Sequence, residues 1–156
     1  MCAFGIFFVD DMDAELRQIA ATVKSGGRVA ISSFAEDYME PMRSLMQTRL
    51  GRLGVPAPPQ IWLRIAREDA CRRLFDQAGL RDIAVECRNL GYFLGGASDW
   101  WDVVWNAGFR RMLSGLSPGE AAAFRQQHLE EVAALRTEDG IWMDIPVLFT
   151  SGCKPG

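Results

Sequence analysis

Histidine is almost absent from this sequence, which contains a single one, His128. The four cysteines, Cys2, Cys71, Cys87 and Cys153, include no C-x-x-C pair. Zinc sites are built from clustered cysteine and histidine ligands, so no metal site is predicted. Widely separated cysteines without a disulfide pattern are typical of a reducing compartment, and we therefore expect a cytoplasmic protein.

Long apolar runs are also lacking. The longest candidate, Phe4 to Val9, is followed directly by Asp10 and Asp11. A membrane-spanning helix needs about 18 apolar residues, and a signal peptide carries a basic segment before its apolar stretch. Neither pattern is present, so the sequence predicts neither a membrane span nor a signal peptide.

Positive charge is not in excess, because the sequence has 17 basic and 20 acidic residues and therefore a net charge of −3. Nucleic-acid-binding proteins show a basic excess or stripe, so we expect no nucleic-acid partner. The 156 residues, of which 49% are apolar and 24% charged, fit one globular domain spanning residues 1–156.

The first third of the sequence has the pattern of a β-α-β unit. Cys2 to Val9 is a continuous apolar run that predicts a buried strand, and Arg28 to Phe34 contains a second one, Val29-Ala30-Ile31. Between them, Asp10 and Asp11 favour a helix start, and Gly26-Gly27 favours a stop. We expect parallel strands joined by a right-handed crossover.

The remaining elements alternate in the same way. Helices are predicted over residues 36–50, 67–78, 98–113 and 118–137, strands over 82–87 and 141–150, a loop over 51–60 and a glycine-bearing turn over 91–96. Ser117, Pro118 and Glu120 predict a capped start for the last helix.

An ordered series of these motifs resembles the second half of class I S-adenosylmethionine-dependent methyltransferases. The series comprises Phe4-Gly5-Ile6-Phe7-Phe8, Asp10-Asp11-Met12, Val23-Lys24-Ser25-Gly26-Gly27-Arg28, Ala78-Gly79-Leu80 and the late strand Ile141 to Thr150. Ser25 stands where proline is usual in that family. The resemblance covers most of the chain.

The resemblance implies an α/β fold with a partial Rossmann-like sheet in the strand order 4-5-7-6. The last strand is expected to be antiparallel, with helices on both faces. The family's glycine-rich cofactor loop, and the acidic residue that holds the ribose, belong to its first two strands. No segment here corresponds to those strands, which implies a C-terminal half. Ala3, Phe4 and Gly5 correspond to the strand tip beside the methyl donor, S-adenosylmethionine.

Residues 98–137 correspond to a helical pair that acts as a lid over the acceptor substrate. Trp100, Trp101 and Trp105 fall on the first of these helices and offer an aromatic wall for an apolar or cationic acceptor. The same spacing also fits ordinary core packing. The loop Gly91 to Ser98 lacks both nucleotide-binding glycine spacings and is predicted to be a plain turn.

Other polar residues have simpler interpretations. Arg43, Arg49, Arg52 and Arg64 could hold an anion, but 15 of the 17 basic residues are arginine, and a solvated surface is the better hypothesis. His128 is predicted to lie on the surface. Asp10 and Asp11 are explained by helix capping without any role in proton transfer.

The sequence therefore predicts a methyltransferase-related chain that transfers a methyl group to an unknown small-molecule acceptor and is incompetent in isolation. The alternative is a non-catalytic association module derived from such an enzyme. In either case the first strand is an open apolar edge, so we expect a homodimer through this strand or a partner that supplies the N-terminal half.

Overall fold

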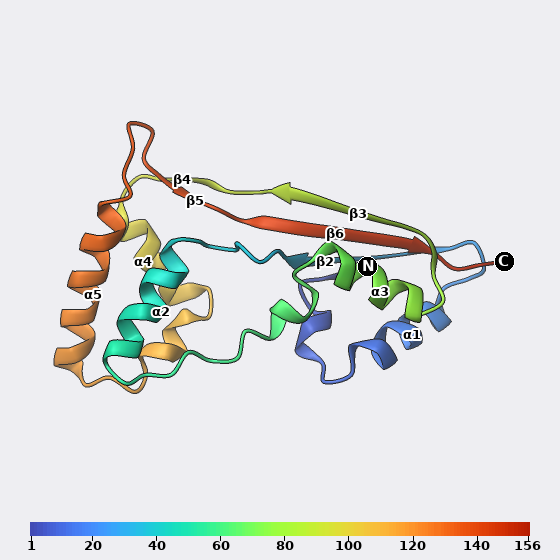
Figure 1. Ribbon diagram of the computed structural model, residues 1–156, viewed down its shortest axis with the longest axis horizontal. Coiled ribbons are helices and arrows are strands. Elements are labelled where there is room, and N and C mark those ends of the chain that lie inside the picture. Colours follow the sequence, from blue (N-terminus) through green and yellow to red (C-terminus); the bar gives the residue numbers. More distant parts are fainter. The chain divides into compact units, whose positions relative to one another are not determined.

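The computed structural model describes all residues from 1 to 156. The chain divides into two compact units (Figure 1). Unit 1 comprises residues 1–38, 60–90 and 145–156, and unit 2 comprises residues 39–59 and 91–144. No helix in either unit has the length and apolar character needed to cross a membrane.

Unit 1 is built on a four-stranded mixed sheet. Its strands are β1 (Cys2–Ala3), β2 (Arg28–Phe34), β3 (Arg81–Asn89) and β6 (Pro146–Cys153), in the order β1-β2-β6-β3. β1 pairs with β2 in parallel, and β6 runs antiparallel to both of its neighbours. This confirms the expected order and directions, in which the last strand of the chain inserts between two parallel strands. The predicted bounds of that strand, Ile141 to Thr150, are wrong, because β6 begins at Pro146 and Ile141–Met143 forms a separate strand of another sheet.

The first strand is much shorter than predicted. Only Cys2 and Ala3 form it, and Phe4 then takes a φ of 51°, so that Ile6–Phe8 folds as a 3-10 helix, η1. The prediction of a strand to Val9 was wrong because a short apolar run indicates burial and does not distinguish a strand from a turn of helix. Ile6 and Phe7 are indeed buried in the core.

The two α-helices of unit 1 lie on the same face of the sheet (Figure 1). α1 (Met12–Thr22), α3 (Glu68–Gln77) and the 3-10 helix η2 (Ile61–Ile65) bury their apolar sides in one cluster with the inward residues of β2 and β6. The expectation of helices on both faces is therefore wrong for unit 1. The path β1, β2, β3 moves in one direction across the sheet, so right-handed crossovers place both helices on one side.

Local capping signals are confirmed. The Asp11 carboxylate accepts a hydrogen bond from the Ala14 N–H at 2.8 Å, which starts α1 one residue later. The helix α5 (Pro118–Ala133) begins with a reciprocal capping box between Ser117 and Glu120. These contacts satisfy backbone N–H groups that helices otherwise leave unpaired.

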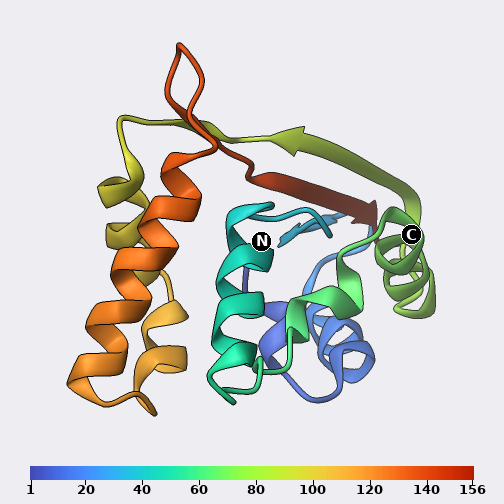
Figure 2. The ribbon, with the colours of Figure 1, turned by 60° about the vertical axis from the view of Figure 1, so that its left-hand side comes forward.

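Unit 2 packs three helices with a two-stranded sheet. The helices are α2 (Met42–Arg52), α4 (Ala97–Asn106) and α5, with the 3-10 helix η3 (Phe109–Leu113) after α4. β4 (Tyr92–Leu94) pairs antiparallel with β5 (Ile141–Met143). Figure 2 shows α4 alongside α5, and α2 also contacts α5.

Several predicted boundaries need correction in unit 2. The predicted turn at 91–96 contains β4, and the predicted helix at 98–113 breaks at Gly108, whose φ of 91° is left-handed. The helix predicted over 36–50 begins only at Met42, after Met39 adopts a φ of 59°. α5 ends at Ala133, before the predicted Thr137.

His128 is wholly buried, which contradicts its predicted surface position. Its Nε2 accepts a hydrogen bond from the Trp100 indole N–H at 2.7 Å, and its ring stacks on Phe124. Its Nδ1 lies 3.6 Å from a Glu131 oxygen, too far for a hydrogen bond. The histidine is therefore part of the core of unit 2.

The prediction of a solvated surface holds for Arg52 and Arg64, which are exposed, and is wrong for Arg43 and Arg49. Arg43 is buried and pairs with Glu40, while Arg49 pairs with Glu131 across α2 and α5. Arg64 donates to the carbonyl oxygens of Phe7 and Asp10 at 2.8 and 2.9 Å. The acidic and carbonyl partners lie outside that stretch of sequence, so composition alone could not reveal them.

Candidate functional site

The predicted cofactor residues Ala3, Phe4 and Gly5 lie where β1 ends. Phe4 donates its backbone N–H to the Ser32 carbonyl at 3.0 Å, which extends the pairing with β2 by one bond. Its left-handed φ of 51° is unfavourable for a side chain with a Cβ and costs on the order of 1–3 kcal/mol. A side chain at Gly5 would meet Cys2 Sγ at 3.0 Å. The tip of β1 is therefore a constrained turn.

An aromatic cluster holds this turn in place. The Phe4 ring stacks on Phe34 at 4.6 Å between centroids, and Phe34 in turn stacks on Tyr38 at 3.8 Å. Trp62 meets both Phe34 and Tyr38 edge to face. Phe4 follows β1, Phe34 ends β2 and Tyr38 lies shortly after it, so the cluster marks the carboxyl ends of both strands. In open α/β sheets this edge is where ligands bind.

A cavity of about 420 Å³ opens on the sheet face opposite α1 and α3. Ala3 and Phe4 line it together with small residues of the neighbouring strands, namely Ala30, Ser32, Ala84 and Ser151. Phe149, which also lines the cavity, is 39% exposed, although it lies on the inner strand β6. No helix of unit 1 covers this face, so it is the apolar surface that the sheet leaves open.

The reactive groups near the tip of β1 are few: the free Cys2 thiol lies beside Gly5, and the Glu86 carboxylate lines the cavity. No group of three metal-ligating side chains occurs in the structure. The nearest buried thiol, Cys71, donates to the Ile65 carbonyl, and burial raises its pKa, so it stays protonated. The site can hold and orient a ligand, and any reaction there depends on the ligand's own reactivity.

Two solved bacterial structures share this fold. A protein from Bacillus halodurans provisionally assigned as a methyltransferase matches 99% of this chain and 68% of its own, with 11% identity and a TM-score of 0.53. The YcgJ protein from Bacillus subtilis matches over 99% of this chain and 62% of its own, with 15% identity and a TM-score of 0.52. The chain has a methyltransferase-like α/β fold.

Phosphoethanolamine N-methyltransferase 2 from Haemonchus contortus, solved with S-adenosylhomocysteine, also matches, with 14% identity and a TM-score of 0.43 over 32% of its length. The chain thus spans between 32% and 68% of the length of these structures. No protein-family model and no curated protein sequence matches the chain.

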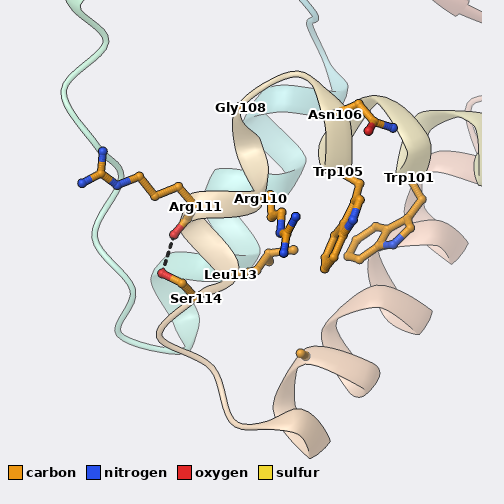
Figure 3. Close-up of a pocket in the computed structure, with 9 residues that line it drawn as sticks. Trp101, Trp105, Asn106, Gly108, Arg110, Arg111, Leu113 and Ser114 are labelled. Atoms are coloured by element: carbon orange, nitrogen blue, oxygen red, sulfur yellow. Dashed lines mark hydrogen bonds between the residues drawn. The ribbon is translucent and has the colours of Figure 1, made fainter.

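A second candidate site lies within unit 2, where a cavity of about 790 Å³ opens beside α4 and η3 (Figure 3). Trp101 and Trp105 from α4 line it, with Arg110 and Leu113 from η3. Trp105 is 46% exposed, and the Arg110 guanidinium stacks on its ring at 4.5 Å. Gly108 makes the turn that brings η3 back beside α4.

Only two of the three predicted substrate-lining tryptophans reach this cavity. Trp100 is fully buried, and its indole N–H is taken by His128. Trp100 and Val104 are four residues apart and form the buried face of α4. Trp101 and Trp105 each follow one of them by one residue, so they share a neighbouring face and line the opening. The sequence analysis did not identify Arg110 as a site residue. Its position five residues after Trp105 was the only sequence signal for it.

Proposed function

We propose that this chain is methyltransferase-related and contributes to the transfer of a methyl group from S-adenosylmethionine to a small-molecule acceptor. The observation that carries the proposal is the sheet order β1-β2-β6-β3 with β6 antiparallel to both neighbours. The Lys24-Ser25-Gly26-Gly27-Arg28 turn into β2, and the Ala78-Gly79-Leu80 turn into β3, are the motif resemblances that support it.

The chemistry needs no catalytic nucleophile from the protein. A lone pair on the acceptor attacks the sulfonium methyl carbon as the carbon–sulfur bond breaks, which leaves S-adenosylhomocysteine and releases the acceptor's proton to water. A protein accelerates such a displacement by aligning the two reactants and excluding water. The apolar residues around Phe4 and Phe34 are suited to that task.

In this proposal Ala3, Phe4 and Gly5 form one wall of the methyl-donor site. They supply a constrained backbone and an aromatic surface but no charged group for the ribose or the amino acid part of the donor. A single wall exposes most of a bound ligand to water, so the chain by itself is expected to bind S-adenosylmethionine weakly or not at all. A partner that supplies the N-terminal half would complete the site.

Calorimetric titration with S-adenosylmethionine tests this proposal on two proteins. One is the 156-residue chain alone, and the other is the chain together with the segment encoded immediately upstream of it, or by a neighbouring gene. We expect weak or no binding by the first and clear binding by the second. Tight binding by the chain alone contradicts the single-wall proposal, and no binding by either contradicts the methyltransferase proposal.

A matched pair of variants tests whether S-adenosylmethionine binds against the wall formed by Ala3, Phe4 and Gly5. Ala3→Leu places a larger side chain in the cavity beside Phe4 and is expected to abolish binding by the completed protein. Ala21→Leu makes the same change at an exposed position of α1 and should leave binding intact. Equal loss in both variants would contradict the assignment of Ala3.

The alternative function is a non-catalytic homo-oligomeric association module. The uncovered sheet face around Phe149, and the free edge of β1, are the observations that favour it. Apolar surfaces of this kind are typical of protein–protein contacts. The proposed homodimer would form through the first strand. Light scattering at micromolar concentration tests it, because a stable 17.4 kDa monomer would contradict self-association.

A further inference from the structure

The tryptophan pocket of unit 2 contains positive charge that no acidic residue neutralises. Arg110 and Arg111 line the pocket, and the Arg125 guanidinium lies 5.4 Å from the Trp101 ring centroid. None of these three arginines forms an ion pair. Elsewhere in unit 2, Arg43 and Arg49 each pair with a glutamate. The charged residues that line the pocket are therefore all basic, which favours an anionic ligand.

The walls of the same pocket are apolar. Trp101 and Trp105 offer two indole faces, and the buried Leu113 of η3 and the half-buried Ala121 of α5 contribute further apolar lining. Figure 3 shows the two indoles next to each other, with the Arg110 side chain directed toward Trp105 and the Arg111 side chain directed away from them. Exposed indoles gain most from a flat apolar ligand that covers them.

Arg110 distinguishes an anionic ligand from a cationic one. Its guanidinium lies 4.5 Å above the Trp105 ring and so occupies an aromatic face that a cationic ligand would need. A second cation there would also be repelled by the arginine. A carboxylate, in contrast, can accept hydrogen bonds from the edge of a stacked guanidinium.

We propose that this pocket binds an amphipathic carboxylate, a molecule with a flat apolar ring system that carries one carboxylate group. The ring system lies against Trp101 and Trp105, and the carboxylate accepts hydrogen bonds from Arg110. That such a carboxylate is the methyl acceptor rests on the proposed function. The binding itself does not.

A ligand series with a constant ring and a varied charge tests this proposal on the full chain. Naphthalene-2-carboxylate, neutral 2-naphthamide and cationic 2-naphthylmethylammonium are titrated by calorimetry. One exposed charged contact is worth up to about 1 kcal/mol, so the carboxylate should bind about fivefold more tightly than the amide. The ammonium should bind most weakly. Tighter binding of the ammonium, or no binding of the carboxylate, overturns the proposal.

The five indole N–H resonances of the chain locate the binding. The resonances of Trp101 and Trp105 should shift on addition of naphthalene-2-carboxylate. The resonance of Trp142, an exposed indole of unit 2 outside the pocket, should not. Shifts confined to Trp142 or Trp62 place the ligand elsewhere and contradict the proposal.

Matched variants separate charge from shape. Arg110→Gln should lower carboxylate affinity about fivefold and leave amide affinity unchanged, whereas Arg52→Gln, at an exposed arginine of α2 outside the pocket, should change neither. Trp105→Leu should weaken both ligands, and Trp142→Leu neither. An unchanged Trp100 resonance, whose N–H is buried against His128, verifies that each variant folds. Equal effects in a variant and its control contradict the assignment.

These measurements require no methyl donor, so their failure is distinguishable from failure of the proposed function. Carboxylate binding by a chain whose completed form binds no S-adenosylmethionine would contradict the methyltransferase proposal alone. Donor binding by the completed protein, with no carboxylate binding in the pocket, would contradict the substrate class alone.

Discussion

Replacing His128 by glutamine should change how the stability of unit 2 depends on pH. Burial lowers the pKa of His128 below its usual value of 6.5, against an opposing effect of the Glu131 carboxylate, while Arg49 lowers the pKa further. The folded protein thus keeps this histidine neutral. In the unfolded chain the same side chain binds a proton as the pH falls below about 6.5, which favours unfolding.

The size of the effect has an upper limit. If the folded histidine stays neutral, the stability that it loses between pH 7.5 and pH 5.5 approaches about 1.4 kcal/mol, the free energy of protonating the unfolded form. His128→Gln keeps an acceptor for the Trp100 N–H but cannot titrate. The variant should be less stable at pH 7.5, because it loses the stacking on Phe124, and the difference should shrink at pH 5.5.

Urea unfolding of both proteins at pH 5.5, 6.5 and 7.5, followed by circular dichroism, measures this difference. Because the chain has one histidine, its ring resonances also report the folded pKa directly. Identical pH dependence in the two proteins, or a folded pKa at or above 6.5, would refute the reasoning. Protonation of Glu131 does not contribute to this difference. Hydrogen bonds from Arg49 lower the pKa of Glu131, so in the folded protein this carboxylate is protonated only at more acidic pH.

Three further changes test other parts of the structure. Gly152→Ala places a Cβ 3.0 Å from Phe75 and should destabilise unit 1 by about 1–3 kcal/mol in urea unfolding. Arg64→Gln removes the donors that hold the carbonyls after β1 and should cost about 1.5–3 kcal/mol in the same assay. Thiol labelling of the native chain should modify the exposed Cys87 quickly and the buried Cys71 only after unfolding.

Each of these changes has a control or a contradicting result. Gly119→Ala adds the same methyl group at a position with open space and should be neutral or stabilising. Arg52→Gln removes an exposed arginine of α2 and should leave the unfolding midpoint unchanged. Labelling of Cys71 at the rate of Cys87 in the folded chain would mean that the core of unit 1 opens readily.

Much of unit 1 could be predicted because its signals are local. β2 has the predicted bounds, and the Asp11 cap fixes the start of α1. The strand order followed from the family resemblance and not from composition or spacing. The turn at Phe4 could not be predicted from the apolar run after Ala3. Phe4 stacks on Phe34, and this contact joins residues far apart in sequence.

Unit 2 was harder to predict because its decisive contacts join distant segments. The surface position of His128 was inferred from its polar neighbours along the chain, but its partner Trp100 lies 28 residues away. The pairing of β4 with β5 likewise connects residues about 50 apart and gives no local signal. In the pocket, the tryptophan stripe was visible in sequence, whereas the cation beside it depends on the reversal at Gly108.

The ladder between β3 and β6 gives the chain a way to vary one part of itself without disturbing another. Asn89 pairs with Pro146, and the Leu90 N–H donates to the Ile145 carbonyl at 2.8 Å, so the 54 residues from 91 to 144 begin and end at hydrogen-bonded neighbours. In topological terms this segment joins the two strands of the β3–β6 hairpin. Since the entropy of closing a loop grows only slowly with its length, such a segment can be lengthened, shortened or exchanged while the sheet keeps its register. A change in the residues that form the tryptophan pocket therefore need not alter the pairing of β3 with β6.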